Sequence, residues 1–102
     1  MREIMEVAKF IRKETDRADM YAYEAVKHKT EFPDMAQHYY NAAQAHLNIA
    51  DDLHAGAVRM IEMARRSGAE PTAVMLKVWE HEHEMMIDDR ESVHRKMAMF
   101  KM

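Results

Sequence analysis

The sequence predicts an all-α protein, an antiparallel bundle of three long helices that forms one domain over residues 1–102. Three observations support this fold class. Apolar residues recur at seven-residue intervals through four or five heptads in each of three segments, as they do along one face of a helix. Only two glycines and two prolines interrupt the chain. No segment shows the alternation of β-branched and polar residues that marks a strand.

The prolines set the predicted helix boundaries. The residue before a proline avoids the helical region, so Phe32 and Glu70 are the expected breaks. Gly68 suits the C-terminal cap of the second helix, whereas Gly56 lies inside a helical pattern and predicts a point of close packing. The expected helices span residues 2–31, 34–67 and 71–101, each about 45 Å long at a rise of about 1.5 Å per residue.

The seven-residue columns predict which face each helix buries. The columns are Ile4, Ile11, Ala18, Ala25 and Phe32 in the first helix, Ala36, Ala43, Ala50, Ala57 and Ala64 in the second, and Trp79, Met86, Val93 and Phe100 in the third. An unbroken alanine column should let the neighbouring helices approach closely. Short connections between consecutive helices predict antiparallel neighbours.

Composition excludes several classes of protein. A net charge of −3 argues against a nucleic-acid binder. No apolar run approaches the ~20 residues of a membrane span, and no signal-peptide pattern opens the chain, so we expect a cytoplasmic protein. The absence of cysteine excludes disulfides and thiolate metal sites. There is no nucleophile–base pairing and no glycine-rich phosphate loop, which favours a protein that is not an enzyme.

Polar residues interrupt the predicted core columns at Glu14, His46, His54, His83 and Arg90. Buried charges are costly unless they are paired, so these side chains should meet one another. With turns near residues 32 and 69, a residue of the first helix lies level with one about 72 positions later in the third. The same register places Glu14 level with Asp51, and His54 level with His83. A second polar layer is expected to hold His46 and Arg90.

The segment "WEHEHEMM" (79–86) supplies one of two acid–histidine pairs. Glu80 and His83 have the same spacing of three as Asp51 and His54, which places carboxylate and imidazole at adjacent points of one helix face. Glu80 and His83 are therefore expected to face the bundle beside Trp79. His81 and Glu82 are expected to face water, and Glu82 shares its column with Asp89 and Lys96. Carboxylates with two imidazoles suit iron, manganese or zinc.

With these residues the chain resembles the ferritin-like di-iron carboxylate superfamily, whose bundled helices direct Glu and Glu-x-x-His ligands at a central metal pair. The segment 18–54 is also similar to small ferritin-like bundles found among phage and prophage hypothetical proteins. The resemblance implies five metal ligands: Glu14, Asp51, His54, Glu80 and His83.

The chain departs from that family in three ways. A fourth helix with its own Glu is missing, so Glu84, water or a second subunit would have to supply that ligand. Asp51 replaces a Glu. The residues at 46–49 read His-Leu-Asn-Ile where such helices often carry Glu-x-x-His.

A second interpretation is a non-enzymatic homo-oligomeric structural or accessory protein, of phage or prophage type, in which the Glu, Asp and His cluster is only a polar network. No Lys or Arg occurs from Thr30 to Val58, and this helix carries Tyr39, Tyr40 and many alanines. Because three helices cannot easily cover such a helix on every side, we expect a homodimer or a higher homo-oligomer.

The twelve methionines are expected to fill irregular gaps in the core or at an interface. A third interpretation uses them differently, as soft ligands that scavenge copper or silver together with histidine.

Overall fold

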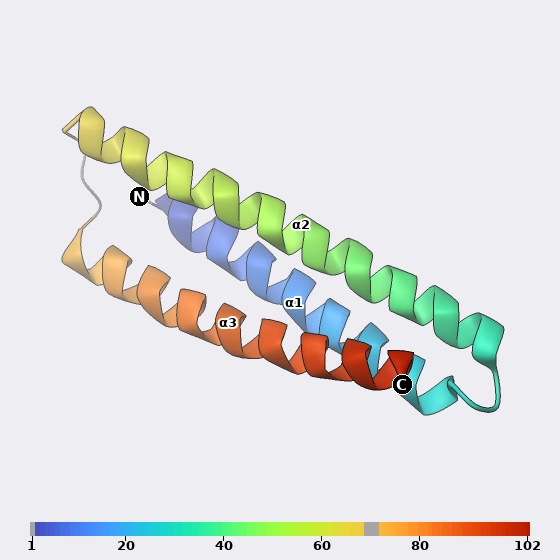
Figure 1. Ribbon diagram of the computed structural model, residues 1–102. Helices are drawn as coiled ribbons and strands as arrows, with labels where there is room; N and C mark the ends of the chain where they lie inside the picture. The colour runs from blue at the N-terminus through green and yellow to red at the C-terminus, as the bar shows by residue number, and fades with distance from the viewer. Residues whose placement is uncertain (1, 69–71) are drawn as a thin grey trace.

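The computed structural model describes residues 2–68 and 72–102. Within these residues it contains three helices and no strand: α1 (Arg2–His28), α2 (Pro33–Arg66) and α3 (Ala73–Lys101). The all-helical prediction is confirmed. Figure 1 shows the chain running along α1, returning along α2 and running again in the first direction along α3. The molecule is elongated, with extents of 56 × 18 × 17 Å.

The helix boundaries follow local chemistry. α2 begins at Pro33, directly after the predicted break at Phe32 and one residue before the predicted start. α1 already ends at His28, three residues before its predicted end. Gly68 follows α2 with a φ of +78°, a conformation that glycine adopts without strain. The Thr72 side chain accepts a hydrogen bond of 3.2 Å from the Met75 backbone N–H and caps α3. The predicted break at Glu70 lies outside the described residues.

The core is built mainly from small side chains on α1 and α2. The α2 alanine column is buried throughout, as predicted. The buried residues of α1 are Ile4, Ala8, Ile11, Thr15, Ala18, Ala22 and Ala25. Small side chains on both helices let their backbones approach closely, and α1 contacts α2 more extensively than it contacts α3.

Three aromatic residues that were predicted to lie in the core are less buried than expected. Phe32 lies beyond the end of α1 and is exposed, and Trp79 and Phe100 are only partly buried. α3 buries only Met86, Val93 and Met97. Gly56 is not a point of close packing within the chain, because a Cβ added there would meet no described atom within 4 Å.

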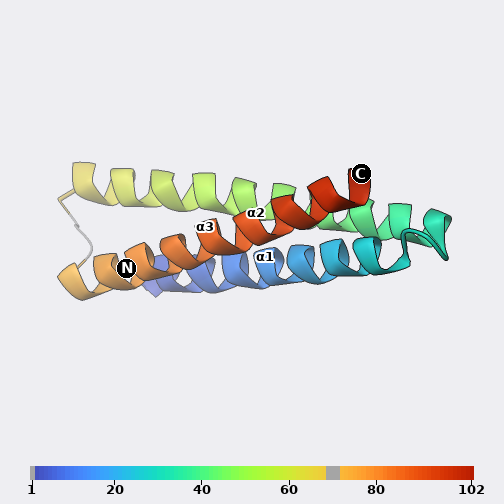
Figure 2. The ribbon, with the colours of Figure 1, turned by 60° about the horizontal axis from the view of Figure 1, so that its bottom comes forward.

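α1 lies between the other two helices. Figures 1 and 2 both show α2 and α3 beside α1 and farther apart at the end where α2 finishes and α3 begins. The backbones of α2 and α3 come close to each other at few points. At the opposite end large side chains bridge them, since the rings of Tyr40 and Phe100 stack with centroids 4.9 Å apart. The described helices include none that is long and apolar enough to cross a membrane.

The register between α1 and α3 is close to the predicted offset of about 72 residues. Hydrogen bonds join residues that are 70 to 77 positions apart in the two helices. The register between α1 and α2 differs from the prediction, because Glu14 lies opposite His46 rather than Asp51. The cause is the early end of α1, which moves the turn toward the N-terminus and slips the pairing by more than one helical turn.

Candidate functional site

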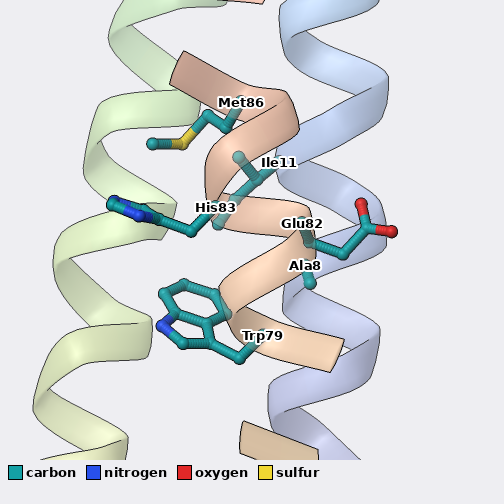
Figure 3. A pocket seen from close by; sticks show the side chains of 6 residues that line it. All are labelled: Ala8, Ile11, Trp79, Glu82, His83 and Met86. Carbon is teal, nitrogen blue, oxygen red and sulfur yellow. The ribbon is translucent and has the colours of Figure 1, made fainter. Parts of the chain in front are cut away.

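Three aromatic rings cluster between α2 and α3 near the end where these helices diverge. The centroids of His54 and His83 are 5.0 Å apart with an interplanar angle of 20°. Trp79 stacks on both, at 5.7 Å from His54 and 6.1 Å from His83. Figure 3 shows Trp79 and His83 directed from α3 toward α2. The predicted approach of His54 to His83 is therefore confirmed.

The surroundings of His54 in this ring cluster favour its uncharged form. Burial lowers the pKa of His54, and the neighbouring His83 lowers it further, because a second positive charge beside it is unfavourable. His54 is therefore neutral at pH 7, and the stacked pair carries no repulsion there.

Glu14 belongs to a different layer of the bundle. His46 Nδ1 donates a hydrogen bond to the Glu14 carboxylate, across the contact between α1 and α2. The ring of Tyr21 covers His46, with centroids 5.3 Å apart. His46 and His54 are eight residues apart on α2, which is about 12 Å along a helix. The prediction that Glu14 lies beside His54 is therefore wrong.

Asp51 and Glu80 also have other surroundings than predicted. Asp51 forms an ion pair with Arg90, so a guanidinium group takes the place expected for a metal ion or an imidazole. Arg90 therefore does not share a layer with His46. Glu80 is exposed rather than directed into the bundle, and His81 is exposed as predicted.

The column of Glu82, Asp89 and Lys96 was expected to face solvent, and that expectation is wrong. Glu82 forms an ion pair with Arg12 at 3.4 Å and points toward α1 (Figure 3). Lys96 contacts Asp19 at 2.7 Å, again on α1. A helical wheel gives angles around one helix but not the direction of its neighbour, and α1 lies on this side of α3.

The sequence did not predict the contact between the buried Thr15 hydroxyl and the Asp89 carboxyl, whose pKa is raised. Thr15 is fully buried, and its Oγ1 donates to the Arg12 carbonyl at 3.0 Å and contacts Asp89 Oδ2 at 3.3 Å. Burial raises the pKa of Asp89, as does the charge of Asp16, while the Thr15 hydrogen bond lowers it. The one feature of the sequence that could have indicated a buried Thr15 is its seven-residue spacing from Ala8 and Ala22, which are also buried.

The five predicted ligands are thus distributed over separate partners. In the described part of the chain, no group of three or more His, Asp or Glu side chains is placed to hold a metal ion. His54 and His83 lie together, but Glu14 and Asp51 are already paired with a histidine and an arginine. The residues present in this arrangement do not fit a di-iron carboxylate centre.

Two hollows adjoin the ring cluster. The inner one is lined by Ala8, Ile11, Trp79, Glu82, His83 and Met86 (Figure 3) and has no room for a water molecule. The outer one is a groove of about 320 Å³ between α2 and α3, lined by Val58, Ile61, Glu62, Arg65, Leu76, Trp79 and Glu80. We call it the α2/α3 groove. Its floor is apolar and its edges are charged.

Comparison of the chain with protein-family models, with curated proteins and with solved structures found no match.

Proposed function

We propose that this protein is a non-enzymatic helical bundle that acts by self-association, as a structural or accessory homo-oligomer. The observation that carries the proposal is the α2/α3 groove, on the side of the molecule away from α1. Its apolar floor includes Leu76 and Trp79, which remain only partly buried, and Val58, which is exposed. Apolar surface of this kind is favourable to cover, and a helix from a second copy has a suitable shape.

The helix arrangement supports the same proposal. α1 contacts both other helices while α2 and α3 scarcely approach each other, as at three corners of a four-helix bundle. A helix from another subunit in the fourth position would complete an antiparallel, ferritin-like architecture. In this proposal the ferritin-like feature is the packing of helices and not a metal centre.

The ion pairs between helices fit a structural role. Glu14 is paired with His46, Asp51 with Arg90 and Glu82 with Arg12. Each pair joins two different helices and can be satisfied only in one register, so it disfavours slipped alternatives.

Sedimentation equilibrium of the untagged protein tests this proposal. The monomer has a mass of 12.0 kDa. We expect the weight-average mass to rise above that value as the concentration increases into the micromolar range. A mass that stays at the monomer value at several hundred micromolar would contradict the proposal.

A further inference from the structure

The far side of α1 carries a row of cations with two exposed apolar side chains. Lys9, Lys13 and Arg17 are exposed, follow one another at four-residue spacing and form no ion pair with any described residue. Met20 is 67% exposed and Phe10 56% exposed, with Lys13 Nζ 5.7 Å from the Phe10 ring centroid. We call these five residues the basic face of α1.

Among the residues that line the α2/α3 groove, Glu62 and Glu80 are acidic and Arg65 is basic, and further exposed acids follow along α3. Three exposed acids follow one side of α3, at Glu80, Glu84 and Glu91. On a helical wheel they lie about 60–100° from His83, on the side away from α1. All three are exposed, and within the described ranges none has an ion-pair partner. Ile87, which is 42% exposed, lies between Glu84 and Glu91 along α3 and on the same side of the helix.

We infer that the α2/α3 groove binds the basic face of α1 from a second copy of this chain. The inference rests on the proposed self-association and identifies the two surfaces that meet. Phe10 and Met20 would cover the apolar floor beside Trp79, and the lysines would meet the glutamates along α3. Opposite potentials across an interface favour encounter and fix the register.

The positions of the two surfaces determine the kind of assembly. They lie on opposite sides of one chain, because the groove lies between α2 and α3, whereas the basic face is the exposed side of α1 that is turned away from both of these helices. A two-fold contact would place glutamates against glutamates or lysines against lysines. The complementary contact is head-to-tail, so each added copy exposes a new groove and a new basic face. The assembly therefore grows with concentration beyond a dimer.

Charge reversal on each surface tests the inference. One variant carries Lys9→Glu, Lys13→Glu and Arg17→Glu, and the other carries Glu80→Lys, Glu84→Lys and Glu91→Lys. Each variant alone has two like-charged surfaces and should remain monomeric by light scattering. An equimolar mixture should assemble again, because the acidic face of the first variant can bind the basic groove of the second, and the original groove of the first can bind the original basic face of the second. The control Asp34→Lys with Asp52→Lys changes exposed charges elsewhere on α2 and should assemble like the original protein.

The outcomes separate this inference from the proposed function. Loss of assembly in each variant, with recovery on mixing, supports both, provided circular dichroism shows unchanged helix content. Assembly that persists in both variants, or that stops at a dimer, overturns the head-to-tail contact and leaves self-association intact. An original protein that never associates overturns the proposed function itself.

Discussion

The imidazole rings of His54 and His83 stack across the boundary between α2 and α3, with centroids 5.0 Å apart. This contact joins two helices whose backbones scarcely meet. Burial and the neighbouring ring both lower the pKa of His54 below its ordinary value of 6.5. The contact therefore links the position of α3 to the protonation of one side chain.

The stability of the protein should fall as the pH drops below about 6.5. An unfolded His54 takes up a proton at its ordinary pKa, whereas the folded one resists until a lower pH, so the unfolded state binds more protons in that window. We expect a lower melting temperature at pH 5.5 than at pH 7.5, and a smaller difference in His54→Gln. The exposed His81→Gln serves as the control and should keep the original pH dependence. If the original protein, His54→Gln and His81→Gln all showed the same pH dependence of the melting temperature, His54 would not be its cause.

A double-mutant cycle tests the register between α1 and α2. Glu14→Gln combined with His46→Gln should show a coupling energy of about 0.5–3 kcal/mol, since the two residues are in contact. Glu14→Gln combined with His54→Gln should be additive within about 0.5 kcal/mol, because these residues share no partner. The free energies of unfolding come from urea titrations. Coupling of Glu14 to His54 instead of His46 would restore the register expected from the sequence.

Replacement of Thr15 by valine should destabilise the protein although the side chain keeps its shape. The change removes the hydroxyl that contacts Asp89 and leaves a partly buried carboxyl without that donor. A loss of about 1–3 kcal/mol is expected for an interior acceptor that loses its partner. Chemical denaturation measures it, with Thr30→Val as the matched change at an exposed threonine. Equal stability of the two variants would show that the buried hydrogen bonds contribute nothing.

Metal analysis tests the prediction that the sequence made through its resemblance to ferritin-like proteins. Because Glu14 and Asp51 already have other partners, we expect no stoichiometric iron, manganese or zinc in protein purified without an affinity tag or chelator. Elemental analysis by mass spectrometry provides the measurement. A stoichiometric metal that disappears in His54→Ala and His83→Ala, but not in His81→Ala, would establish the predicted site instead.

Much of the fold could be predicted because heptad columns record burial directly. The alanine column of α2 is buried as expected, and so are Ile4, Ile11, Ala18 and Ala25 of the α1 column, whereas Phe32 of that column is exposed. The columns do not show where α1 ends. The end of α1 at His28 depends on which of several residues before Pro33 leaves the helix, and it sets the whole α1–α2 register.

The candidate site was harder to predict, because it depends on the register between α1 and α2 and on which side of each helix its neighbouring helix lies. His54 and His83 were paired correctly, since their positions depend on the turn between α2 and α3. Glu14 was placed more than a helical turn away from its true partner. Glu82 was assigned to solvent because a wheel for α3 does not show on which side α1 lies.

The central claim is that the α2/α3 groove is covered when the protein assembles, and Trp79 reports on it directly. Trp79 is the only tryptophan, and it lines the groove while remaining partly exposed. As the concentration rises and the mass measured by sedimentation increases, its emission maximum should move to shorter wavelength and its quenching by acrylamide should decrease. A rising mass with unchanged emission and unchanged quenching would contradict the claim, because the assembly would then leave the groove open.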